Sequence, residues 1–206
     1  MPSIYGLKPA FQNLLRPLVN GLARIGVTAN EVTLAGLLVS LIAGAMIAWA
    51  RGGRTLLLLP AVLFVRMALN AMDGMLAREH GQKTSLGALL NELGDVIADA
   101  GLYLPLALVP AFDPRLITGV VVLSILTEMT GVIAVQIGAS RRYDGPLGKS
   151  DRAFLFGLLG LLLGLRLPVE RAIPIVLWAM LFLLMVTIVN RARRALQELS
   201  AGVAQR

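Results

Sequence analysis

Long apolar runs separated by short polar segments organise the whole chain. Residues 32–50 and 172–190 each contain nineteen positions without a charged side chain, which is enough for a helix to cross about 30 Å of hydrocarbon. Pro110 and Pro114 predict a turn between two further runs, because proline and the residue before it resist helical continuation. The pattern predicts six transmembrane helices, at about 30–50, 54–79, 85–110, 114–139, 151–168 and 169–191.

The segment before the first span has a different pattern. Between residues 5 and 25, apolar positions recur at helical spacing, with Lys8, Arg16 and Arg24 between them. This periodicity is typical of a helix that lies in the cytoplasmic headgroup layer, and an amphipathic connector packed on the bundle fits it equally well. Since no internal repeat or low-complexity tract interrupts the sequence, we expect a single transmembrane domain over residues 1–206.

Composition supports the membrane assignment. Of the 206 residues, 57% are apolar and 15% are charged, whereas soluble domains carry about 45–50% apolar and about 25% charged residues. These values exclude a soluble enzyme and a disordered tail, and the absence of cysteine excludes a disulfide scaffold. The predicted fold class is therefore an all-α integral membrane protein.

The net charge of +7 is distributed unevenly across the predicted membrane. Thirteen Lys and Arg residues lie in the two termini and in the loops near residues 80 and 140, while five lie on the opposite side. Basic residues concentrate on the cytoplasmic side of membrane proteins. We therefore expect both termini to be cytoplasmic, in the inner membrane, and the charge gives no reason to expect a nucleic-acid partner.

The third predicted span contains several acidic residues, although an ionised side chain at bilayer depth costs at least about 2.5–3.5 kcal/mol. Asn91, Asp95 and Asp99 recur every four residues and therefore share one helix face, which Glu92 joins. Acidic residues at such depth usually mark a functional site.

The second span carries polar residues on one face as well. If the chain turns near residues 80–81, Gly74 lies opposite Gly87, Asn70 opposite Asn91 and Arg66 opposite Asp95. Asp73 then lies one turn from Asn70. Carboxylate and amide oxygens that converge in this way suit Mg²⁺ or Mn²⁺. A purely structural ion-pair network, in which Arg66 pairs with Asp95 or with Glu128, would also explain these residues.

The stretch from Asn70 to Asp95 resembles the signature of the CDP-alcohol phosphatidyltransferases, D-x2-D-G-x2-A-R-x8-G-x3-D-x3-D. Asn70 and Asn91 stand where the signature has its first and third aspartates. The start of the first span resembles the family's P-N-x-x-T sequence, with Ala29 in place of proline. The matching signature positions are Asp73, Gly74, Ala77, Arg78, Gly87 and Asp95.

The resemblance implies a membrane enzyme of phospholipid biosynthesis. Such enzymes bind two divalent ions through the signature aspartates, hold the pyrophosphate of a CDP-linked lipid and let an acceptor hydroxyl displace CMP. By position, Asp73 and Asp95 would be catalytic metal ligands, and Asp95 would also be the general base. The residues expected at the nucleotide are Asn30, Thr33, Gly74, Ala77, Arg78 and Gly87.

The two asparagines change the expected metal site. Asparagine keeps a carbonyl oxygen for coordination but loses the negative charge. Asp99, one turn beyond Asp95, and Glu92, beside Asn91, are available to compensate. The sequence is therefore compatible with two Mg²⁺ or Mn²⁺ ions, with one ion or with a site that has lost activity. The expected ligands are Asn70, Asp73, Asn91, Asp95 and Asp99.

The loop before the fifth span carries four cations. It resembles the family segment that holds the phosphate of a phosphorylated acceptor such as glycerol 3-phosphate, and paired arginine and lysine side chains suit that task. A cytoplasmic loop also obeys the positive-inside rule without any such function. The candidate acceptor-binding residues are Arg141, Arg142, Lys149 and Arg152.

These features predict a transferase that moves a phosphatidyl group from CDP-diacylglycerol to a small alcohol, phosphorylated or not. Two alternatives remain: a phosphoalcohol transferase acting from a CDP-alcohol on a diradylglycerol, and a transporter or scaffold that has lost catalysis. We also expect a homodimer. Gly157, Gly160 and Gly164 form a small-residue stripe that predicts close helix packing, within one protomer or across that dimer.

Overall fold

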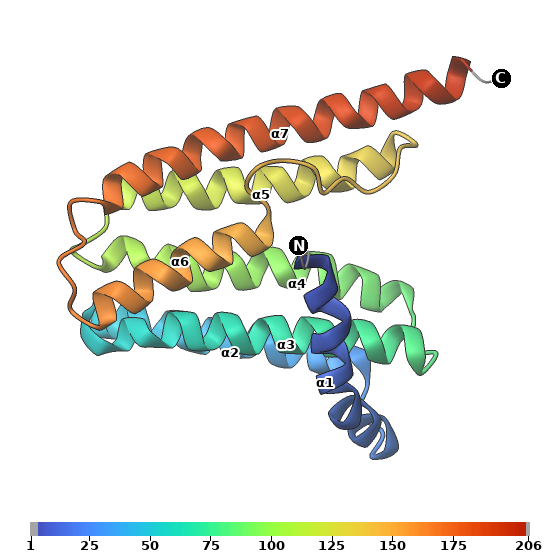
Figure 1. The fold of residues 1–206 in the computed structure, drawn as a ribbon, viewed down its shortest axis with the longest axis horizontal. Helices are drawn as coiled ribbons and strands as arrows, with labels where there is room; N and C mark the ends of the chain where they lie inside the picture. Colours follow the sequence, from blue (N-terminus) through green and yellow to red (C-terminus); the bar gives the residue numbers. More distant parts are fainter. Residues whose placement is uncertain (1–3, 205–206) are drawn as a thin grey trace. The chain divides into compact units, whose positions relative to one another are not determined.

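The computed structural model describes the backbone of residues 4–204 and the side chains of residues 10–201. All the secondary structure in this range is helical, which confirms the all-α prediction. In chain order the helices are α1 (Ile4–Arg24), α2 (Ala29–Ala50), η1 (Gly53–Leu57), α3 (Leu58–Glu79), α4 (Ser85–Tyr103), η2 (Leu104–Leu108), α5 (Pro114–Gln136), α6 (Lys149–Gly164) and α7 (Ile173–Ala204) (Figure 1).

Four helical segments in the described range are long and apolar enough to cross a membrane. They are α2, η1 with α3, α5, and α7 as far as Ala201. The two other predicted spans are less clear by this measure, since α4 carries three acids and α6 has only 16 residues. A span needs about 20 apolar residues. The membrane character of the chain is thus supported, and the number of six spans stays a prediction.

The chain forms two compact units, and a single domain stays a prediction. The first unit consists of residues 1–43 and 61–101, and the second consists of residues 44–60 and 102–206. The first unit therefore contains α1 and most of α2, α3 and α4. The second contains η1, η2 and the three C-terminal helices.

In the first unit, α1 lies across α3 (Figure 1). Val19 of α1 is buried in a cluster with Met72, Met75 and Leu76 of α3. The opposite side of α1 leaves large apolar side chains exposed, including Leu14. One face of this amphipathic helix thus packs on the bundle, and its place in the headgroup layer stays a prediction.

In the second unit, α5 and α7 run side by side, and α6 packs against η1 (Figure 1). The α6–η1 contact depends on two glycines. A Cβ atom added at Gly160 would lie 2.9 Å from the carbonyl oxygen of Leu56, and one at Gly164 would lie 2.7 Å from the side chain of Leu57. These two members of the small-residue stripe therefore serve packing within the protomer, and the homodimer stays a prediction.

We expect Gly160→Ala to destabilise the protein by about 1–3 kcal/mol, since the added methyl group would force the backbone of η1 away from α6. The measurement is the apparent midpoint of thermal unfolding in detergent, followed by circular dichroism. Gly21→Ala is the matched control, because a Cβ atom there meets nothing within 4 Å. Equal midpoints for the two variants would contradict the close packing of α6 on η1.

Candidate functional site

The start of α2 and the α3–α4 turn are fixed by capping interactions. The hydroxyl of Thr28 accepts a hydrogen bond from the backbone NH of Glu31, and the Glu31 carboxylate accepts one from the Thr28 backbone NH, which is a capping box. The Ala29 NH donates to the side-chain oxygen of Gln82 in the turn, over 2.7 Å. Gly81 adopts a φ of 68°, which glycine accommodates without strain. The capping box therefore gives Glu31, at the mouth of the first span, a structural role.

The first aspartate of the site is held by α2. The hydroxyl of Thr33 donates a hydrogen bond of 2.8 Å to Oδ2 of Asp73, and Asp73 is buried. Sequence reasoning placed Thr33 at the nucleotide. In the structure Thr33 orients one of the two predicted catalytic carboxylates.

The second aspartate is held by α3. The amide nitrogen of Asn70 donates to Oδ1 of Asp95 over 3.2 Å, and the Asp95 side chain is 28% exposed. Asp73 follows Asn70 by three residues, so the two side chains are neighbours on one face of α3. Two hydrogen-bonded pairs, Thr33 with Asp73 and Asn70 with Asp95, thus start from neighbouring positions of α3, and we call these four residues the aspartate site.

Arg66 completes the aspartate site with a positive charge. Its Nη1 lies 2.8 Å from Oδ1 of Asp99, and its Nη2 lies 3.8 Å from Oδ1 of Asp95. The predicted proximity of Arg66 and Asp95 is therefore confirmed. The closer partner is Asp99, one turn further along α4, and both members of this pair are buried.

The other residues expected at the nucleotide occur in two pairs. A Cβ atom at Gly87 would lie 2.8 Å from Oδ1 of Asn30, so the missing side chain makes room for this asparagine. A Cβ atom at Gly74 would lie 3.0 Å from both terminal nitrogens of Arg78, whose guanidinium lies over Gly74 on the same helix. Ala77 is partly buried against the α1–α3 cluster. The hairpin register had suggested that the two glycines face each other, and their nearest neighbours are instead Asn30 and Arg78.

The expected metal ligands do not all gather at one point. Within the part of the chain that the structure describes, no three His, Cys, Asp or Glu side chains form a group that could hold a metal ion. Asp99 is engaged by Arg66, and Asn91 is exposed on α4. Asp73 and Asp95 are the two carboxylates at matching signature positions, and they stay the candidate ligands. Mg²⁺ is commonly bound in this way, through one or two carboxylates together with substrate phosphates.

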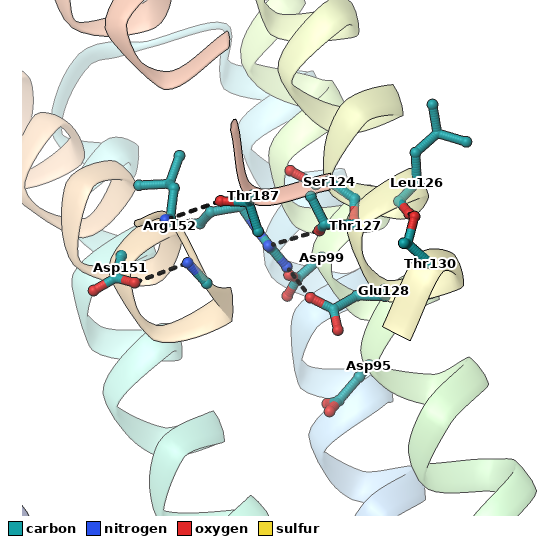
Figure 2. A network of polar contacts seen from close by, with 12 residues as sticks. Asp95, Asp99, Ser124, Leu126, Thr127, Glu128, Thr130, Asp151, Arg152 and Thr187 are labelled. Atoms are coloured by element: carbon teal, nitrogen blue, oxygen red, sulfur yellow. Dashed lines mark hydrogen bonds and ion pairs between the residues drawn. The ribbon is translucent and has the colours of Figure 1, made fainter. Parts of the chain in front are cut away.

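A second polar set lies in the other unit, around Glu128 of α5 (Figure 2). The carboxylate of Glu128 lies 3.2 Å from Arg141, 3.2 Å from Arg152 and 3.3 Å from Arg191. The side chains of Arg152 and Arg191 are only 1% and 2% exposed. Arg191 also donates to the backbone oxygen of Thr127. We call Glu128 and these three arginines the arginine cluster.

The arginine cluster places three guanidinium groups around one carboxylate. Removing that carboxylate would take an ion-pair partner from the buried arginines, which typically costs about 3–5 kcal/mol. The cluster also depends on Gly131, because a Cβ atom there would lie 1.7 Å from Nη1 of Arg141. Converging guanidinium groups also suit phosphate oxygens, so the cluster is the candidate site for the acceptor's phosphate.

The four cations expected at the acceptor separate in the structure. Arg141 and Arg152 join the arginine cluster, whereas Arg142 pairs with Asp144 over 2.7 Å and with Glu198 over 2.8 Å. Lys149 is the first residue of α6. The Asp151 carboxylate accepts a hydrogen bond from the Gly148 NH at this helix start (Figure 2), which fixes the entry of α6.

Sequence reasoning did not assign Glu128 or Arg191 to the acceptor site. The sequence offered Glu128 as an alternative partner for Arg66. In the structure it pairs instead with arginines of the loop, α6 and α7. Arg191 was counted only in the positive-inside comparison, because it stands at the end of the last predicted span. Glu128 of α5 and Arg191 of α7 are 63 residues apart in the sequence, so no local pattern predicts their contact.

Sequence comparison matches residues 26–191 to the CDP-alcohol phosphatidyltransferase family. The chain is 47% identical over 195 residues to the inner membrane protein YnbA of Escherichia coli K12, covering 94% of this chain and 96% of the relative. It is 30% identical over 207 residues to the phosphatidylinositol phosphate synthase of Corynebacterium glutamicum, covering 93% and 87% of the two chains.

Two solved structures of the phosphatidylinositol phosphate synthase of Mycobacterium tuberculosis share the fold. The structure with manganese and citrate gives a TM-score of 0.74 and covers 87% of each chain. The structure with CDP-DAG bound gives a TM-score of 0.72 and covers 87% of this chain and 92% of the other. Sequence identity is 23% in both cases, so the likeness concerns the fold.

Proposed function

We propose that this chain, which belongs to the CDP-alcohol phosphatidyltransferase family of membrane enzymes, transfers a phosphatidyl group from CDP-diacylglycerol to a small phosphorylated alcohol. The observation that carries the proposal is the aspartate site. There, two carboxylates are each oriented by a hydrogen bond from a neighbouring helix. The CDP-DAG held by the fold neighbour and the activity named for the C. glutamicum relative support the donor and the acceptor class.

Asp73 and Asp95 are the residues that would hold Mg²⁺ or Mn²⁺, and the manganese in the fold neighbour supports this choice of ion. Such a cation supplies charge neutralisation at the pyrophosphate of the donor. Thr33 and Asn70 keep the two carboxylates in fixed orientations, as hydrogen-bond partners of metal ligands commonly do.

Asp95 is the better placed of the two carboxylates to act as the base. Its side chain is partly exposed, whereas Asp73 is buried. In the proposed step, the acceptor oxygen forms a bond to the phosphatidyl phosphorus while the bond from that phosphorus to CMP breaks. Asp95 accepts the hydroxyl proton, and CMP leaves with the bonding electrons.

The arginine cluster is the proposed site for the acceptor's phosphate. A phosphate monoester carries about −1.5 to −2 charges at pH 7, and the cluster gathers three guanidinium groups around the single carboxylate of Glu128. Guanidinium groups also present paired donors that fit phosphate oxygens. A phosphorylated alcohol is therefore the acceptor class that this site fits.

We expect Asp73→Asn and Asp95→Asn to lower divalent-dependent release of CMP from CDP-diacylglycerol by roughly 10²-fold or more, because each removes a charged ligand and the second also removes the base. The measurement is CMP release by detergent-solubilised protein. Glu79→Gln is the control, since Glu79 forms an exposed ion pair with Arg16. Undiminished activity in both aspartate variants would eliminate the proposed mechanism.

For the acceptor, we expect a phosphorylated alcohol such as glycerol 3-phosphate or inositol phosphate to support CMP release, and its phosphate-free counterpart to fail. Arg141→Gln should raise the KM for the phosphorylated acceptor about 10- to 100-fold, as the loss of one charged hydrogen bond predicts. Arg16→Gln is the control for general effects of charge. A KM effect confined to CDP-diacylglycerol would reassign the cluster to the donor.

We also propose that both termini face the cytoplasm, on the evidence of the basic residues. The chain lacks cysteine, so a single introduced cysteine reports its own side of the membrane. We expect an impermeant maleimide to label Arg171→Cys in right-side-out vesicles and Lys83→Cys only after permeabilisation; both native residues are exposed. The opposite labelling pattern would reverse the proposed orientation.

A further inference from the structure

Asn70 acts as a hydrogen-bond donor in the aspartate site. Its amide nitrogen lies 3.2 Å from Oδ1 of Asp95. Its amide oxygen is directed elsewhere, 4.0 Å from the position that a Cβ atom on Gly36 of α2 would take. Two ligands that share a cation both present oxygen lone pairs to it, whereas an amide NH group cannot coordinate a cation. Asn70 therefore holds Asp95 in place by a hydrogen bond and is not itself a ligand of the cation.

Arg66 places a resident positive charge beside the same carboxylate. The residue is buried, with Nη1 at 2.8 Å from Asp99 and Nη2 at 3.8 Å from Asp95. Nη2 is buried and makes no hydrogen bond within the described residues. A guanidinium cannot lose its charge at accessible pH. This charge neutralises one of the two α4 carboxylates and disfavours a second dication near them.

Two carboxylates remain at the signature positions, those of Asp73 and Asp95. Asp99, one turn further along α4, pairs with the Arg66 guanidinium over 2.8 Å. The acids available to compensate for the asparagines do not complete a second ligand group, because no three acidic or histidine side chains in the described part of the chain gather to hold a metal.

We propose that the aspartate site holds one divalent cation, between Asp73 and Asp95, and that the Arg66 guanidinium occupies the electrostatic role of the second cation implied by the family signature. The inference rests on the proposed function for the identity of the site. The proposed site differs in two ways from the one that the signature implies. It holds one ion in place of two, and Arg66 acts as a positioning residue for Asp95.

The test counts bound Mn²⁺ by electron paramagnetic resonance on the full-length protein in detergent, with saturating CDP. We expect one Mn²⁺ per chain, with a spectrum free of coupling between neighbouring ions. Two coupled ions per chain, or none, would overturn the proposal. A single bound ion in a protein without transferase activity would leave this inference intact and refute the proposed function.

The role of Arg66 is tested by the sign of an affinity change. We expect Arg66→Gln to tighten Mn²⁺ binding roughly tenfold, because it removes one positive charge from the neighbourhood of the dication, and Arg66→Lys to keep the native affinity. Glu79→Gln, at the surface ion pair with Arg16, is the control. Weaker or unchanged binding in a folded Arg66→Gln variant would overturn the electrostatic role.

Asn70→Asp offers a second measurement that does not depend on the folding of the Arg66 variant. The substitution is nearly isosteric, and it replaces the donor that faces Asp95 with a like charge. We expect roughly tenfold tighter Mn²⁺ binding, since the added carboxylate can be neutralised by the ion. Unchanged or weaker binding would contradict the assignment of Asn70 as a hydrogen-bond partner beside a single-ion site.

Discussion

The structure depends on the compensation of charge inside apolar helices. An ionised side chain that is buried without a partner is strongly unfavourable, because the surroundings cannot replace its hydration. Arg66 and Asp99 satisfy this requirement across α3 and α4 in the first unit, and Glu128 satisfies it for the buried arginines in the second. Both polar sets are thus fixed by the same constraint, with carboxylates in the majority in the first and guanidinium groups in the majority in the second.

The different composition gives the two sets different proposed roles. The aspartate site gathers carboxylates and is the proposed place for a cation and the phosphates that a cation attracts. The arginine cluster gathers guanidinium groups and is the proposed place for an anion. In the proposed reaction, the first set would serve the nucleotide-linked donor and the second the phosphorylated acceptor.

Much of the fold and part of the site could be predicted because their signals are local. Helix positions follow from apolar runs, and the faces that carry Asp73 and Asp95 follow from helical periodicity. The turn near residues 80–81 also predicted the approach of Arg66 to Asp95. The stronger pairing with Asp99 was missed, since side-chain length and rotamer, which no periodicity specifies, let Arg66 reach one turn further along α4.

The sequence by itself determined the helical class, the apolar segments and the aspartates on their helix faces, because each depends on residues only a few positions apart. Only the tertiary structure decided which partner each charge takes. Thr33 orients Asp73 across 40 residues, and Glu128 gathers arginines from a loop, α6 and α7. Such choices depend on the packing of distant helices, where burial makes every unpaired charge costly and so selects one set of partners.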